Sequence, residues 1–276
     1  MANSTKISRI NKSKEKQEEK YKAFALMVID WYEKCGRHDL VWRQKINPYK
    51  ILVSEIMLQQ TQVSRVLPKF TVWMKKYPTL EKLSQASLTD ILLLWQGLGY
   101  QRRAKALLML AKTTTRLPKT ESELIALPGI GPYTAGAIMA FAYDKESLML
   151  ETNIRTALIN AFHMRKKDID DTLLKKDLQR LLQQPEVKVL GARHWYYALM
   201  DYGAFLKTKQ ISHNKKVKGY RPQTKYEGSD RKLRAEILFA ITKGTKLPED
   251  NRVPALLRIL AKEGFIVATS DTWSIV

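Results

Sequence analysis

Apolar side chains recur at helical spacing along most of this chain. Between residues 18 and 34, for example, Phe24, Met27, Val28 and Trp31 fall on one face of a predicted helix. Similar patterns occur at about 50–59, 62–76, 80–85, 88–95, 100–115, 121–127, 132–143, 153–162, 171–183 and 191–206. Strand-type alternation is absent from these segments, so the pattern predicts an all-α body.

The two ends of the chain differ from this helical body. Residues 1–15 are polar and basic, which predicts a disordered tail. Seven Lys or Arg and no acid lie between Lys207 and Lys225. We interpret residues 207–229 as an exposed basic linker, with a merely solvated loop as the alternative.

Residues 230–276 have the pattern of a small module. Helical spacing at about 230–242 and 252–262 precedes two short β runs, at 265–268 and 272–276, with a turn at 269–271 between them. Two helices followed by a β-hairpin predict a winged-helix-like module.

Residues 127–135, LPGIGPYTA, join two predicted helices through an unusual turn. Gly129 and Gly131 can take the positive φ values that a tight turn requires. Pro132 suits the first position of the second helix, where a backbone N–H has no partner. The segment predicts a helix-hairpin-helix whose turn amides could bind an anion. A helical corner buried in a core is the alternative.

The charge and the cysteine content of the chain limit the classes of function that it can have. The 276 residues contain 48 Lys and Arg against 27 Asp and Glu, a net charge of +21, which predicts attraction to a polyanion such as nucleic acid. No apolar run approaches the ~18 residues of a membrane span, and residues 1–22 lack the apolar core of a signal peptide. One cysteine, Cys35, excludes an internal disulfide and a four-cysteine metal site, and we expect an intracellular protein of the cytoplasm or nucleoid.

Glu55 is the first candidate for acid chemistry, because it lies within an apolar stretch, LVSEIML. Burial would raise the pKa of this carboxyl group and make it a proton donor near neutral pH. The alternative is an exposed Glu on the polar face of an amphipathic helix.

Glu151 is the second candidate, at the predicted start of the helix at 153–162. An acid there interacts favourably with the positive end of the helix dipole, so capping alone is one interpretation. The other is a carboxylate that faces a developing positive charge.

Four segments together resemble the helix-hairpin-helix (HhH-GPD) DNA glycosylase superfamily, and most closely its MutY-type adenine glycosylases. They are 48–63 (PYKILVSEIMLQQTQV), 95–104 (WQGLGYQRRA), 127–137 (LPGIGPYTAGA) and 150–155 (LETNIR), in the family's order. The resemblance covers about residues 20–206. It implies a two-lobed fold, with a six-helix barrel lobe at about 45–150 and a second lobe from 16–44 and 151–206.

The resemblance also implies roles in catalysis. Glu55 would protonate the leaving purine. Glu151, followed by the matching Asn153, stands where the family has the Asp that stabilises the cationic sugar. Tyr133 occupies the place of the lysine in lyase-type relatives, so we expect a monofunctional enzyme. Hydrolysis through a cationic sugar requires one acid and one carboxylate.

The remaining implied residues contact DNA or the base. DNA contacts are implied for Gln59, Gln60, Tyr100, Gly129, Gly131 and Thr134, and the base pocket for Trp42, Arg43 and Tyr197. The base must leave the stack, which requires inserted side chains. The hairpin backbone of the family often binds a monovalent or alkaline cation together with a phosphate; we expect no other metal or cofactor.

Four departures from the family pattern affect the prediction. Glu151 replaces Asp, which moves the carboxylate by roughly one C–C bond. The iron–sulfur cysteines expected after the motif at 200–204 are absent. The C-terminal domain that recognises 8-oxoguanine is missing. Tyr197 replaces a polar pocket residue, whereas Trp195 and Tyr196 are interpreted as core.

The sequence therefore predicts a monomeric, monofunctional glycosylase that excises a mispaired adenine from double-stranded DNA in base-excision repair. Two alternatives stay open. One is a glycosylase for mismatched thymine or uracil, or for a damaged base, on the same scaffold. The other is a lesion-binding protein with weak catalysis.

Overall fold

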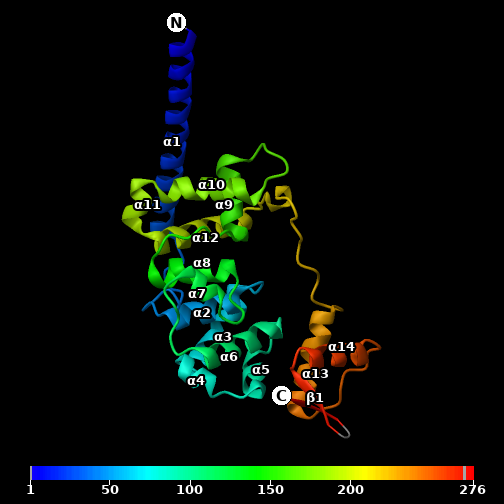
Figure 1. Ribbon diagram of the computed structural model, residues 1–276. Helices are drawn as coiled ribbons and strands as arrows, with labels where there is room; N and C mark the ends of the chain where they lie inside the picture. The colour runs from blue at the N-terminus through cyan, green and yellow to red at the C-terminus, as the bar shows by residue number, and fades with distance from the viewer. Residues whose placement is uncertain (1, 270–271) are drawn as a thin grey trace. The chain divides into compact units, whose positions relative to one another are not determined.

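The structure is a computed structural model that describes residues 2–269 and 272–276 (Figure 1). The chain divides into two compact units. Unit 1 contains residues 1–46 and 135–221, and unit 2 contains residues 47–134 and 222–276. The described residues are mostly helical, so the predicted fold class is confirmed.

Unit 1 is a helical layer around α9 and α12. Its elements are α1 (Ala2–Cys35), α9 (Thr152–Phe162), α10 (Asp171–Leu182), α11 (Pro185–Leu190), α12 (Ala192–Thr208), the 3-10 helix η1 (Asn214–Lys216), and α8 (Pro132–Tyr143) from Ala135 on. α12 packs against α9 and α1. Gly203 permits the first of these contacts, because a Cβ atom there would lie 2.5 Å from the carbonyl carbon of Asn153.

Unit 2 combines a central helical group with the C-terminal module. Its elements are α2 (Pro48–Leu58), α3 (Val63–Lys76), α4 (Leu80–Ser84), α5 (Leu88–Trp95), α6 (Gln101–Thr113), α7 (Glu121–Ile125), α13 (Asp230–Lys243), α14 (Val253–Lys262), β1 (Ile266–Ala268) and β2 (Trp273–Ile275). Trp73 and Trp95 meet edge to face in its core, with ring centroids 5.6 Å apart.

The C-terminal module has the predicted elements. α13 packs against α14, β2 and α5, and β1 pairs antiparallel with β2 in the register Ile266 to Ile275. The predicted turn between the strands lies partly outside the described residues. The module therefore shares a unit with α5 and does not form a unit of its own.

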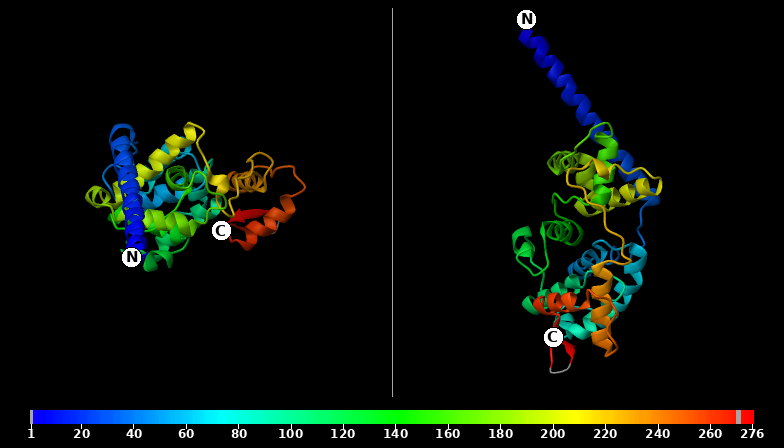
Figure 2. Two further views of the ribbon diagram at one scale, coloured as in Figure 1. Left: turned by 90° about the horizontal axis from the view of Figure 1, so that it is seen from above. Right: turned by 90° about the vertical axis from the view of Figure 1, so that its right-hand side faces the viewer.

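The predicted disordered tail differs from the structure, in which α1 begins at Ala2 (Figure 2). The N-terminal part of α1 projects beyond the rest of unit 1 in Figure 1 and in the right-hand view of Figure 2. The polar composition misled the prediction, because the segment lacks Pro and Gly and contains Ala, Arg and three Lys, which are good helix formers.

The predicted basic linker is partly folded. η1 lies within it, and Asn214 is 3 % exposed and donates hydrogen bonds to the Thr152 carbonyl (3.1 Å) and to Thr156 Oγ1 (3.0 Å). Backbone bonds also join Ile169 to Lys216 and Lys218, at 2.7 and 2.9 Å. These contacts attach residues 214–218 to unit 1.

The units also divide the chain differently from the expected lobes. Residues 135–150 belong to unit 1, whereas the sequence assigned them to the barrel lobe. Contacts with the start of α12 explain the assignment, since the backbone N–H of Arg193 donates to Asp144 Oδ1 (2.8 Å) and its Nε donates to the Phe141 carbonyl (2.6 Å).

Candidate active site

Glu55 is held in the middle of α2, a helix that is buried on all sides. Asn47 caps the helix by accepting hydrogen bonds from the backbone N–H groups of Tyr49 and Lys50, and Pro48 occupies its first turn. Glu55 is only 6 % exposed. The alternative of an exposed Glu on a polar helix face is therefore wrong, because this helix has no polar face.

The start of α8 is tied to α2 by two side-chain contacts. Tyr133 Oη donates to Glu55 Oε2 across 3.3 Å, and Gln59 Nε2 donates to Thr134 Oγ1 across 3.1 Å. Thr134 is 3 % exposed. Its side chain therefore supports the hairpin, and only its backbone is suited to a phosphate contact.

The helix-hairpin-helix forms between α7 and α8 as predicted, with Pro132 as the first residue of α8. Gly129 has a φ of +75°, and a Cβ atom there would lie 2.5 Å from that of Ala106. Gly131 does not have a positive φ, so the expectation for it was wrong. No atom lies within 4 Å of where its Cβ would be, and this open space leaves room for a ligand.

Gln60 and Tyr100 share an unusual backbone conformation and a hydrogen bond. Their φ values are +57° and +50°, in the left-handed region that side chains other than Gly rarely adopt. Tyr100 Oη donates to Gln60 Oε1 across 3.2 Å, and Gln60 is exposed. These two of the predicted DNA-contacting residues therefore lie next to each other at the surface of unit 2.

Arg103 is a residue of this site that sequence reasoning missed. Its Nη1 lies 2.7 Å from the Ile56 carbonyl oxygen at the end of α2, and its Nη2 lies 3.0 and 3.1 Å from those of Leu98 and Gly99. Burial lowers the pKa of this guanidinium to about 10. Arg103 thus holds the end of α2 against the loop that precedes α6.

Glu151 begins α9 in unit 1 as its N-cap. Its Oε1 accepts hydrogen bonds from the backbone N–H groups of Asn153 (2.7 Å) and Ile154 (2.8 Å). Burial raises the pKa of this carboxyl group, although those bonds and the charges of Lys207 and Arg155 act to lower it. Capping therefore occurs as one interpretation predicted, and both capping bonds are made to Oε1.

Lys207 adds a charge beside this cap that the sequence did not indicate. Its Nζ donates to Asn153 Oδ1 across 2.7 Å, and burial lowers the pKa of the Lys207 ammonium while Glu151 acts to raise it. The close packing of α12 on α9 at Gly203 brings Lys207, one turn further along α12, to Asn153.

The three predicted base-pocket residues are buried. Trp42 and Tyr197 are 3 % and 4 % exposed. Arg43 donates to both carboxylate oxygens of Asp201, at 2.7 and 2.9 Å, and its Cζ lies 4.1 Å from the Tyr197 ring centroid. Burial acts to raise the pKa of Asp201, but Arg43 and Arg37 hold it below its ordinary value. Arg43 is thus held between the carboxylate of Asp201 and the ring of Tyr197.

The cysteine content of the chain does not fit an iron–sulfur cluster. The chain has one cysteine, Cys35, which is exposed in the last turn of α1, whereas such a cluster requires four thiolates. Among residues 15–269 and 272–276, whose side chains the structure describes, no group of three or more His, Cys, Asp or Glu could hold a metal ion. No helix in the described part of the chain is long and apolar enough to cross a membrane.

Comparison with known proteins finds relatives that agree with one another. Residues 53–184 match the family described as HhH-GPD superfamily base excision DNA repair protein. The chain is 37 % identical to the adenine DNA glycosylase of Buchnera aphidicola subsp. Baizongia pistaciae, over 66 % of this chain and 52 % of that protein. It is 32 % identical to the adenine DNA glycosylase of Mycolicibacterium smegmatis, over 79 % of this chain and 80 % of that protein. The chain thus spans about half of the first relative's length and four fifths of the second's.

Solved structures share the fold. A thermostable thymine-DNA glycosylase superposes with a TM-score of 0.60 at 22 % identity, over 72 % of this chain and 93 % of that one. Endonuclease III in a trapped DNA complex gives a TM-score of 0.56 at 16 % identity, over 68 % of this chain and 86 % of that one. The family model and the relative that is 32 % identical over four fifths of its length show that the chain belongs to the HhH-GPD superfamily of base excision DNA repair proteins, in the family of the adenine DNA glycosylases.

Proposed function

We propose that this protein is a DNA N-glycosylase that hydrolyses the bond between a mispaired adenine and its deoxyribose. One observation carries the proposal: a carboxyl group that is 6 % exposed, on an apolar helix, accepts a hydrogen bond from the first turn after the hairpin. A buried carboxyl group is a suitable proton donor for a purine leaving group. The relatives named adenine DNA glycosylase support adenine as the base.

The proposed roles follow the chemistry of each residue. Glu55 protonates the leaving base, and the carboxylate of Glu151 stabilises the cationic sugar and orients water. Asn153, which Lys207 holds by its side chain, fixes the start of the same helix. Tyr133 has no amine to form a Schiff base with the sugar, so the protein releases the base without cleaving the strand.

DNA is the proposed partner, bound by a monomer. The net charge of +21 favours a polyanion, and the amides near Gly129 and Gly131 are suited to one backbone phosphate, with a monovalent or alkaline cation beside them. The base has to leave the stack before Glu55 can reach it, at a cost of a few kcal/mol. Gln60 and Tyr100 are the side chains proposed to fill the gap.

A panel of labelled duplexes tests the proposal. Each duplex carries one target, 8-oxoguanine·A, G·A, G·T, G·U or hypoxanthine, and is treated with alkali after incubation. Strand breaks at A support the proposal. Breaks at T or U instead identify a mismatch pyrimidine glycosylase, and tight binding without breaks identifies a lesion-binding protein. A break at A before alkali would contradict the monofunctional assignment.

A further inference from the structure

The C-terminal module reaches the surface position of Tyr100 and Gln60. Gln223 Nε2 donates to Tyr100 Oη across 3.0 Å, and Arg231 Nη1 donates to the same oxygen. The Arg231 Cζ atom also lies 4.9 Å from the Tyr100 ring centroid. Arg231 is therefore bound both to the hydroxyl group and to the ring of Tyr100.

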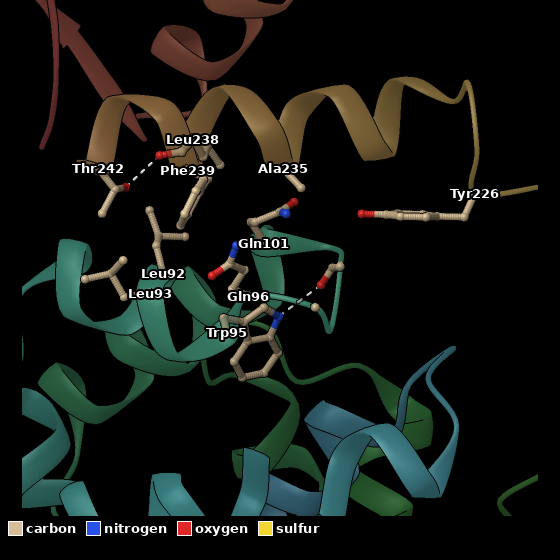
Figure 3. A pocket seen from close by; sticks show the side chains of 12 residues that line it. Leu92, Leu93, Trp95, Gln96, Gln101, Tyr226, Ala235, Leu238, Phe239 and Thr242 are labelled. Atoms are coloured by element: carbon tan, nitrogen blue, oxygen red, sulfur yellow. Dashed lines mark hydrogen bonds between the residues drawn. The ribbon is translucent and has the colours of Figure 1, made fainter. Parts of the chain in front are cut away.

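The helix that carries Arg231 is fixed against the segment that carries Tyr100. Leu238 and Phe239 of α13 face Leu92 and Leu93 of α5 around a cavity of about 30 Å³, and Tyr226 lies at the other end (Figure 3). The cavity is small, and α13 packs directly against α5 beside it.

A second anchor connects the module to α6, the helix that Tyr100 begins. Glu263 at the end of α14 accepts hydrogen bonds from Arg102 of α6 and, at 2.5 and 3.1 Å, from Arg234 of α13. These hydrogen bonds lower the pKa of Glu263 to about 2. Lys105 also donates to the Gly264 carbonyl across 2.7 Å. The module is thus attached to the first turns of α6 through Glu263 and Gly264.

The backbone at Tyr100 requires such support. Gln60 and Tyr100 are the only non-glycine residues with positive φ within the described part of unit 2. Left-handed conformations of this kind cost of order 1–3 kcal/mol and occur at functional sites, where surrounding contacts maintain them. Arg103 holds the backbone next to Tyr100 by its hydrogen bond to the Gly99 carbonyl, whereas Arg231 and Gln223 hold the hydroxyl group of Tyr100.

We propose that Arg231 is a positioning residue for base extrusion, through which the C-terminal module holds Tyr100 in the orientation that enters the duplex. This inference rests on the proposed function, since it assigns a task within it. Tyr100 has two χ angles to restrain, and the guanidinium restrains both the ring and its hydroxyl group. The module then has a direct part in the reaction although it contributes no group to the chemistry.

The test measures base unstacking in a double-mutant cycle. The probe is a duplex with 2-aminopurine opposite guanine, in a nucleotide whose 2′-fluorine prevents base release, and the readout is the fluorescence rise at saturating protein. We expect Arg231→Ala and Tyr100→Phe each to lower the unstacking equilibrium roughly 10-fold, as loss of a charge-assisted hydrogen bond implies. We expect the double variant to lose less than the product of the two single losses, because both variants remove the hydrogen bond between Arg231 and Tyr100.

Lys232→Ala is the matched control, since it removes one positive charge at the next position of α13 and Lys232 contacts Glu227 and Glu236 instead. Lys232→Ala should leave the unstacking equilibrium unchanged. When it is combined with Tyr100→Phe, the loss should equal that of Tyr100→Phe alone. If Arg231→Ala does not fold, Gln223→Ala in the exposed segment replaces it, with an expected loss of roughly 3-fold.

Three results would overturn the inference. The first is that Arg231→Ala has the same effect as Lys232→Ala. The second is that the loss in the double variant of Arg231 and Tyr100 is the product of the two single losses. The third is that the wild-type protein unstacks no base. Unstacking does not require base release. A wild-type protein that unstacks the probe through Arg231 but releases no adenine would therefore refute the proposed function and leave this inference standing.

Discussion

The hydroxyl group of Tyr133 donates a hydrogen bond to Glu55 Oε2 across 3.3 Å, which links the first turn of α8 to the buried acid of α2. The hairpin that is proposed to bind a phosphate thus contacts the group that is proposed to protonate the base. A shift of the hairpin on DNA would be transmitted to the position of this carboxyl group, since Gln59 and Thr134 join the same two helices.

Replacement of Glu55 by Gln removes the proton donor but keeps its size and its hydrogen bond with Tyr133. We expect the single-turnover rate of adenine release to fall at least ~10³-fold, within the range of acid catalysis. Affinity for the mismatched duplex, measured by fluorescence anisotropy, should change less than about threefold, because DNA affinity comes mainly from phosphate contacts. Unchanged turnover would remove Glu55 from the mechanism.

Replacement of Glu151 by Asp separates capping from chemistry. Asp is a good N-cap, so the melting temperature should stay close to that of the wild type. The carboxylate withdraws by roughly one C–C bond, and we expect the release rate to fall about 10-fold or more. A faster Glu151→Asp enzyme would show instead that the longer side chain attenuates activity.

Replacement of Lys207 by Met should change the pH dependence of base release. Burial already raises the pKa of Glu151, and the positive charge of Lys207 acts to lower it. Removal of that charge raises this pKa further, so Glu151 stays protonated to a higher pH. The acid limb of the rate profile, followed from about pH 4.5 to 8, should therefore move to higher pH.

Lys215→Met, on the exposed side of η1, is the matched control for charge. Its acid limb should coincide with that of the wild type. If the acid limb moves equally in both variants, the general positive potential of the protein causes the shift. If it moves in neither variant, Glu151 is not the titrating group.

The two hairpin glycines should respond differently to Ala. Gly129→Ala places a Cβ atom 2.5 Å from Ala106 Cβ at a φ of +75°, so it should lower the free energy of unfolding by about 1–3 kcal/mol. Gly131→Ala meets no atom within 4 Å and should leave the protein's stability unchanged. If the space at Gly131 receives a phosphate, this variant should bind DNA more weakly in the same anisotropy assay. Equal melting temperatures for the two variants would contradict the turn geometry.

Local pattern predicted much of the fold and part of the site. The apolar residues on both sides of Glu55 indicated that it is buried, and Pro132 marked the start of α8. In contrast, composition misassigned residues 1–15, because polarity indicates solvent exposure and does not by itself exclude a helix. The hexapeptide of α11 was too short to show a helical period.

Contacts between distant residues were beyond the sequence. Lys207 meets Asn153 across 54 positions, and Arg231 meets Tyr100 across 131 positions. Arg103 binds mainly backbone carbonyls, which every residue carries, so nothing in the sequence marks its partners. Packing decides all three contacts, and a pattern of residue types does not determine packing.

Identification of the released base distinguishes adenine excision from the excision of other bases. A mixture of equal amounts of duplexes with A opposite guanine, A opposite 8-oxoguanine, and T or U opposite guanine is incubated with the full chain, and free bases are measured by mass spectrometry. The account predicts that adenine is released, that thymine and uracil are not, and that Glu55→Gln releases none. Release of thymine or uracil in preference to adenine, or no release of any base, would contradict it.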